Sequence, residues 1–163
     1  MAGFELSRTA RLPADEAWRR LTDWPRHSAN VPFTRVGPVA GTAQGLGGVV
    51  VARTSLLGLG FDDPMEIVLW QPPGAAAGPG PGGPGPDPDA GSGSGAVGRC
   101  RLEKRGTVVR GWAEILVVPQ GQGSRVTWRE EVFCRGVPRA ADPLLAAAGR
   151  RMFGRVLDAL LAP

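Results

Sequence analysis

The stretch that decides the fold is residues 142–161, DPLLAAAGRRMFGRVLDALL, near the end of the chain. At about 100° per residue, one side of this stretch is apolar and the other is charged or small. The predicted inward side holds Leu145, Ala148, Gly149, Met152, Phe153, Val156, Ala159 and Leu160, and the outward side holds Arg150, Arg151, Gly154, Arg155 and Asp158. Asp142 is predicted to cap the helix, with Pro143 at its first position. The pattern indicates an amphipathic helix that needs a broad apolar partner.

That partner is predicted to be a sheet, because most of the chain before residue 135 shows strand patterns. The predicted strands are 4–11, 35–41, 47–55, 60–70, 97–104, 107–118 and 124–134. After the first strand the period changes: one short helix is predicted from Asp15 to Trp24 and a second from Pro25 to Asn30. The order is strand, two helices, six strands and a long helix, which predicts an α+β fold with antiparallel hairpins.

Residues 72–96 differ sharply from the rest of the chain, with nine Gly and seven Pro among 25 residues. Such a segment buries too little apolar surface to offset the entropy lost on ordering, so we predict a disordered loop at a hairpin tip. Loop closure entropy grows slowly with length, so the loop is not interpreted as a domain boundary. The expectation is one domain over residues 1–163.

The composition argues against several classes of partner. Net charge is +4, but 18 of the 19 basic residues are Arg, with Lys104 the exception, and they form no run. We therefore expect no nucleic acid partner. No signal peptide and no apolar run of about 18 residues is present, so we expect no membrane span and a cytoplasmic location, with Cys100 and Cys134 as free thiols.

Four pieces of sequence, in this order, resemble one known superfamily. They are LPADEAW (12–18) with LTDW (21–24), DPMEI (63–67) with WQPP (70–73), GSRVTWREE (123–131), and RRMF (150–153) in the closing helix. The chain resembles the SRPBCC superfamily of START-like helix-grip proteins, in particular its polyketide cyclase/dehydrase-like members. The resemblance implies a curved seven-stranded antiparallel sheet that grips the C-terminal helix around an apolar cavity. It also implies binding of lipids, sterols, polyketides or other hydrophobic molecules, with a minority of members catalysing cyclisation or dehydration.

The positions of charged residues predict which strand face lines this cavity. Glu66, Glu103 and Glu114 are predicted to point outward, which turns their neighbours inward, although one bulge would reverse the assignment. The predicted lining is Trp24, Asp63, Met65, Ile67, Cys100, Leu102, Ile115, Val117, Trp128, Glu130, Leu145, Ala148 and Met152.

Asp63 and Glu130 are the carboxylates on this otherwise apolar face. A carboxylate there must be hydrogen-bonded, paired or protonated, because desolvation without compensation is costly. One interpretation is structural, with Asp63 at a strand end and Glu130 paired with an interior Arg or reached by solvent. The other is that one of the two has a raised pKa and acts as a polar anchor or general base.

Other candidate sites find less support. His27, the only histidine, lies between polar neighbours and is predicted to be exposed and inert; with Cys100 and Cys134 it makes no zinc-spaced cluster, so no metal is expected. Residues 45–48 lack the pattern of a phosphate-binding loop, and no cofactor is expected. Most of the five Trp residues are assigned to core packing, with Trp128 the best candidate for a ligand contact.

Three hypotheses about function remain at this point. The first is binding or carriage of a hydrophobic small molecule, lipid, quinone or polyketide-like, without catalysis, by a monomer or weak homodimer. The second is a polyketide cyclase or dehydrase-type enzyme in which Asp63 or Glu130 moves protons; the absence of Tyr removes a usual acid for enol chemistry. The third is an interaction module that docks through Arg150, Arg151 and Arg155.

Overall fold

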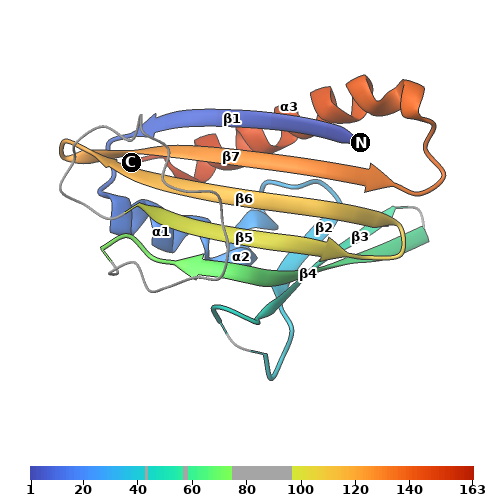
Figure 1. The fold of residues 1–163 in the computed structure, drawn as a ribbon, viewed down its shortest axis with the longest axis horizontal. Coiled ribbons are helices and arrows are strands. Elements are labelled where there is room, and N and C mark those ends of the chain that lie inside the picture. Colours follow the sequence, from blue (N-terminus) through green and yellow to red (C-terminus); the bar gives the residue numbers. More distant parts are fainter. Residues whose placement is uncertain (43, 57–58, 75–96) are drawn as a thin grey trace.

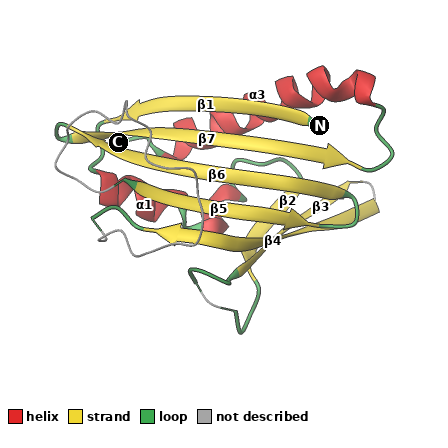
Figure 2. Ribbon diagram, viewed as in Figure 1, coloured by secondary structure: helices red, strands yellow, loops and turns green. Residues whose placement is uncertain are grey.

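The structure, a computed structural model, describes residues 1–42, 44–56, 59–74 and 97–163. Its elements follow the predicted order (Figures 1 and 2). They are β1 (Ala2–Ala10), α1 (Ala14–Leu21), α2 (Trp24–His27), β2 (Thr34–Pro38), β3 (Val49–Leu56), β4 (Leu59–Gln71), β5 (Gly98–Arg105), β6 (Val109–Gln120), β7 (Gly123–Cys134), the 3-10 turn η1 (Arg139–Ala141) and α3 (Asp142–Leu160). The predicted loop falls almost wholly in 75–96, outside the described residues, so its disorder stays a prediction.

The strands form one seven-stranded antiparallel sheet in the order β1-β7-β6-β5-β4-β3-β2. Every neighbour is consecutive in the chain except β1, which pairs with β7 and so joins the two ends of the sequence. The sheet curves strongly, and β2 and β3 run at a steep angle to the long strands (Figure 1). All three helices lie on one side of it. The predicted helix-grip α+β architecture is therefore confirmed.

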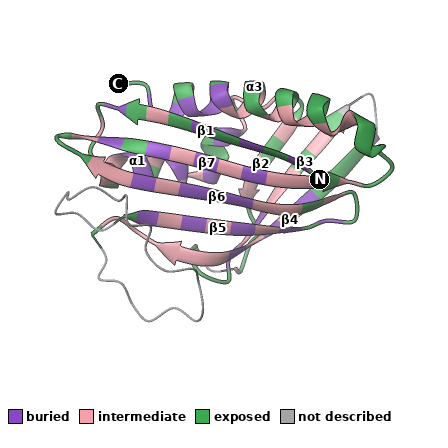
Figure 3. Cartoon of the chain, turned by 45° about the horizontal axis from the view of Figure 1, so that its top comes forward, coloured by how far each residue is buried: buried purple, intermediate pink, exposed green. Residues whose placement is uncertain are grey.

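The core forms where the second half of α3 meets the sheet and α1. Val156, Leu157 and Leu160 are buried there, whereas Leu144 in the first turn is 75% exposed (Figure 3). The predicted helix face was wrong at Gly154, which is buried, and at Ala159, which is exposed. Leu157, which the prediction assigned to neither face, is buried. α1 also packs against this end of α3. More of the helix circumference is therefore buried there than contact with the sheet alone would bury.

The start of α3 also differs from the prediction. Asp142 is the first helical residue and makes no side-chain capping hydrogen bond. Its carboxylate instead lies 2.8 Å from the amino group of Met1. The preceding turn η1 brings the chain into the helix, so a separate capping side chain is not used.

The predicted strand faces are confirmed, with one difference at Glu114. This residue is on the outer face but is only 3% exposed, because long Arg side chains cover it. Arg99 lies 2.8 Å from its carboxylate, and Arg101 and Arg129 lie 3.9 and 4.0 Å away. The positions of the charged residues therefore predicted correctly which face of the sheet Glu114 lies on, but not its low exposure.

No helix in the described part of the chain is long and apolar enough to cross a membrane.

Candidate functional site

A cavity of about 400 Å³ lies between the inner face of the sheet, α2 and the first half of α3. On this half of α3 the lining residues include the small Ala148 and Gly149, which leave space between the helix and the sheet. Nine of the predicted lining residues lie on it: Trp24, Asp63, Met65, Leu102, Trp128, Glu130, Leu145, Ala148 and Met152. Their role in binding a ligand stays a prediction.

The other four predicted residues, Ile67, Cys100, Ile115 and Val117, do not line this cavity. They point inward and are almost completely buried, but they belong to the core cluster. α1 packs on β6 and β7 and helps to fill the inner face of the sheet. Strand parity predicts the face on which a residue lies, but not how far along the strand the cavity extends.

Three charged side chains meet in the cavity wall. The Nζ of Lys104 on β5 lies 2.8 Å from Oδ2 of Asp63 on β4 and 3.3 Å from Oε1 of Glu130 on β7. It also lies 3.4 Å from Sδ of Met65. We call Asp63, Lys104 and Glu130 the buried triad. It explains both carboxylates that the sequence places on the apolar face.

Small residues on β6 allow this contact across a whole strand. Lys104 pairs with Gly111, and Glu130 pairs with Ala113. Any side chain at Gly111 would collide with the backbone, since a Cβ there would meet the carbonyl oxygen of Glu131. With so little bulk on β6, the long Lys104 side chain extends over it toward β7.

The environment keeps the Lys104 ammonium charged. Burial alone lowers the pKa of Lys104, but the charges of Glu130 and Asp63 and their hydrogen bonds outweigh burial, so the pKa is raised above its usual value. Glu130 is further held by Trp128, whose Nε1 donates to Oε2 at 3.1 Å. Both oxygens of Glu130 therefore have partners. In Asp63, Oδ2 has one and the buried Oδ1 has none among the described residues.

Lys104 is the site residue that sequence reasoning missed. The structural interpretation of Glu130 expected an interior Arg as its partner, and the partner is this lysine. Two signals in the sequence were available: Lys104 continues the inward parity of Cys100 and Leu102, and it is the single lysine in a chain whose other basic residues are all Arg.

Comparison with known proteins bears on the fold. No protein-family model and no curated protein sequence matches the chain, but solved structures do. The aromatase/cyclase Zhui from Streptomyces sp. R1128 has a TM-score of 0.60 at 19% identity, over 98% of this chain and 90% of that one. A START superfamily protein from Mycobacterium smegmatis has a TM-score of 0.62 at 10% identity, over 99% and 97%. The structure of Ara h 8.0201 has a TM-score of 0.57 at 12% identity, over 99% and 98%.

The chain has the helix-grip fold. The fold that the resemblance implied is thus confirmed, at identities that establish the fold alone. In this helix-grip fold the long helix is α3, and the space between the grip and the helix is the cavity that holds the buried triad.

His27 is a correction to the sequence analysis, because it is buried rather than exposed. It is 3% exposed, lines the cavity, and has its ring 5.6 Å from that of Trp24 and 5.9 Å from that of Trp128. Nε2 lies 2.9 Å from the carbonyl oxygen of Leu21 and must donate to it, so Nδ1 carries the lone pair. Desolvation lowers the pKa of His27, so the ring is neutral at pH 7. The polar neighbours in sequence were misleading because α2 buries His27 together with Trp24.

The tryptophans divide between the cavity and other sites. Trp128 stacks on Phe153 at 4.8 Å and lines the cavity, as does Trp24. Trp18 packs edge-on against Trp70 at 5.0 Å, and neither lines the cavity. Trp112 is on the outer face, with the guanidinium of Arg101 4.2 Å from its ring. Within the described ranges, no His, Cys, Asp and Glu residues gather in a group that could hold a metal ion.

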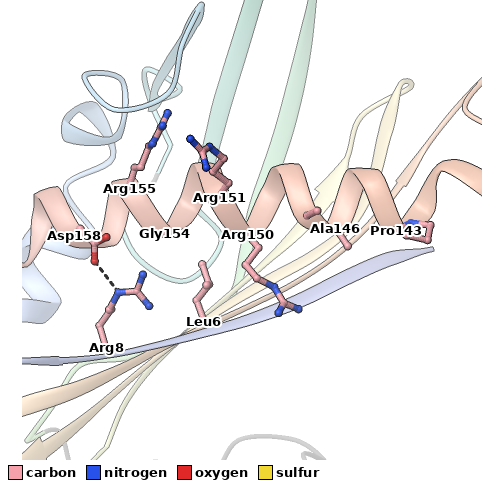
Figure 4. Close-up of a pocket in the computed structure, with 10 residues that line it drawn as sticks. Leu6, Arg8, Pro143, Ala146, Arg150, Arg151, Gly154, Arg155 and Asp158 are labelled. Atoms are coloured by element: carbon pink, nitrogen blue, oxygen red, sulfur yellow. Dashed lines mark hydrogen bonds and ion pairs between the residues drawn. The ribbon is translucent and has the colours of Figure 1, made fainter.

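A second hollow lies outside the grip, between β1 and α3 (Figure 4). Arg8 donates from Nε to Asp158 at 2.7 Å across it. In Figure 4 Arg150 extends toward β1, whereas Arg151 and Arg155 extend away from it. All three arginines of the predicted docking face line this hollow together with Arg8. Their role in docking a partner stays a prediction.

Proposed function

We propose that this protein binds or carries a hydrophobic small molecule, of the lipid, quinone or polyketide-like class, in the cavity between the sheet and α3. The observation that supports the proposal is the cavity itself: about 400 Å³ of space with mainly apolar walls and a few converging polar groups. Sites for small ligands in proteins have this size and composition. An ordinary packed core leaves no void of this size.

The cavity is also accessible from solvent. Of its lining residues, Phe61 is 37% exposed and Ala148 on α3 is exposed. A ligand can therefore reach the cavity beside the first half of α3 without unfolding of the core, which lies at the other end of this helix.

A thermal shift screen with fatty acids, quinones and aromatic polyketides tests the proposal. A ligand at about 100 times its Kd stabilises the native state by about 2.7 kcal/mol, which corresponds to roughly 5–10 °C in Tm for a domain of this size. We expect at least one class to give such a shift. If every compound leaves the Tm unchanged, the proposal is wrong.

Two neighbouring alanines on α3 provide a matched pair of variants. Ala148 lines the cavity, whereas Ala147 lines the hollow outside the grip, and both are exposed. Ala148→Phe places a ring in the ligand's space and should weaken binding at least tenfold, while Ala147→Phe should leave the Kd unchanged. Equal effects of the two substitutions would argue that the ligand binds elsewhere.

A second candidate function is that of a polyketide cyclase or dehydrase-type enzyme. The specific observation in its favour is a buried titratable triad in the cavity wall, in which Asp63 retains an oxygen free to take a proton. Zhui, a structure of similar fold, is an aromatase/cyclase. The test is incubation with a poly-β-ketone: turnover produces an aromatic chromophore, and Asp63→Asn should abolish it while binding persists. Binding without a chromophore supports the carrier function.

We further propose a cytoplasmic protein of a single domain that acts as a monomer or weak homodimer without nucleic acid. Free cysteines, one of them the buried Cys100, suit a reducing compartment. Sedimentation over a concentration series tests the oligomeric state.

A further inference from the structure

Some polar groups of the cavity already have hydrogen-bond partners within the protein, and others do not. The charged donors are occupied: Nζ of Lys104 faces Asp63, Glu130 and Met65 at 2.8, 3.3 and 3.4 Å. An ammonium has three protons, so these partners leave none for a ligand. Trp128 Nε1 has a single proton, and Glu130 accepts it.

The neutral N–H and O–H donors of the described cavity side chains are also occupied. The His27 ring proton is donated to the carbonyl oxygen of Leu21. The hydroxyls of Thr34 and Thr54 lie 2.9 Å apart, and Thr34 Oγ1 also donates to Pro32 at 3.2 Å. With Thr34 donating to Pro32, Thr54 donates to Thr34, and both protons are used.

Apart from the thiol of Cys134, which is a weak donor, the cavity side-chain atoms without a partner in the described part of the chain are acceptors. Asp63 lines the cavity, is 6% exposed, and its Oδ1 is buried with no hydrogen-bond partner in the described part of the chain. The Nδ1 lone pair of His27 has no hydrogen-bond partner among the same residues. The buried triad also holds two carboxylates against one ammonium. A buried carboxylate oxygen without a donor destabilises the protein, and a donor from elsewhere would remove that penalty.

Resting on the proposed function, we infer that the ligand of this cavity is a hydrophobic molecule bearing a hydrogen-bond donor, a hydroxyl or an amine, that it presents to Oδ1 of Asp63. The terminal torsion of an Asp side chain is soft, so the carboxylate can turn to meet the donor. A ligand carboxylate would find no free N–H or O–H donor among the described cavity side chains, and it would add negative charge to a site that already holds two carboxylates against one ammonium. The cavity therefore selects against fatty acids and other carboxylates.

Four naphthalene derivatives of similar size separate these possibilities by isothermal titration calorimetry at pH 7. 2-Naphthol donates a hydrogen bond, 1-naphthylmethylamine donates as a cation, 2-methoxynaphthalene only accepts, and 2-naphthoate is an anion. One hydrogen bond to a charged acceptor corresponds to about a tenfold change in Kd. We expect at least one of the two donors to bind about tenfold tighter than 2-methoxynaphthalene, and 2-naphthoate to bind most weakly.

Asp63→Asn tests the assignment to one side chain. It should reduce the preference for the donor over 2-methoxynaphthalene to less than twofold. Asp62→Asn is the matched control, since Asp62 is the adjacent carboxylate on the outer face and pairs with Arg53; it should leave the preference intact. If Asp63→Asn does not fold, the ligand series on the unmodified protein decides.

The outcomes separate the two proposals. Equal affinity for all four compounds, or tightest binding of 2-naphthoate, overturns the donor inference and leaves the proposed function standing. No binding of any of them overturns both. A donor preference that survives Asp63→Asn overturns the assignment to Oδ1.

Discussion

Replacing Lys104 with methionine removes the cation of the buried triad and keeps most of the side-chain volume. The variant leaves Asp63 and Glu130, 6% and 5% exposed, without their shared counter-charge. The substitution therefore tests whether the native state depends on the ion pairs or only on the apolar stem of the lysine.

The expected loss follows from the two distances. With an effective dielectric constant of about 20, a unit charge pair gains about 6 kcal/mol at the 2.8 Å of Asp63 and about 5 kcal/mol at the 3.3 Å of Glu130. Removing the lysine also removes the cost of desolvating its ammonium, which offsets a large part of this gain. Breaking a buried pair on one side costs about 3–5 kcal/mol in general, and we expect a loss in that range.

Urea denaturation followed by circular dichroism measures the loss as a difference in the free energy of unfolding. At pH 7 the variant should be less stable than the unmodified protein by about 3–5 kcal/mol. Acid neutralises an unpaired carboxylate, so the native state of the variant takes up a proton more readily and the difference should shrink between pH 7 and pH 5. Arg53→Met, which removes an exposed ion pair to Asp62, should change stability little at either pH.

Two results would refute this reasoning. If Lys104→Met is as stable as the unmodified protein at pH 7, the ion pairs do not stabilise the fold. If the loss is the same at pH 5 as at pH 7, it arises from packing and not from charge. The triple variant Asp63→Asn, Lys104→Met, Glu130→Gln carries no charge and should recover much of the stability.

Further predictions concern His27 and two glycines of α3. Because burial lowers the pKa of His27, the unfolded state binds its proton first, and stability should fall as the pH drops from 7 toward 5.5, with a slope of at most about 1.4 kcal/mol per pH unit. His27→Gln, which keeps a donor for Leu21, should show a shallower slope in urea denaturation; an equal slope assigns the effect to another group. Gly154→Ala should raise stability by up to about 1 kcal/mol through helix propensity, since its Cβ would meet only the far end of the Arg8 side chain, at 3.4 Å. Gly149→Ala should be less stable than Gly154→Ala by about 1–3 kcal/mol, because its Cβ would overlap the Phe4 ring; a more stable Gly149→Ala would show that this ring moves freely.

Local patterns in the sequence predicted the elements and their faces. Alternation in β7 assigned Val126, Trp128 and Glu130 to the inner face, and the structure agrees. The change of period after β1 predicted α1 and α2. These predictions succeed because the period of a strand or helix depends on neighbouring residues, and the apolar face must be buried somewhere.

Contacts between residues far apart in the sequence could be identified only from the tertiary structure. Glu130 meets Lys104 across β6 because the register of the sheet places the small residues Gly111 and Ala113 opposite them. That register depends on pairings between segments far apart in the chain.

The sequence by itself determined the order of elements, the inner faces of the strands and the presence of two carboxylates on an apolar surface. Only the tertiary structure decided that Lys104 neutralises one of these charges, that His27 is buried, and that the cavity ends before Ile67. The physical reason is that side-chain direction follows from local geometry, whereas burial and charge pairing depend on which other elements pack against that side chain.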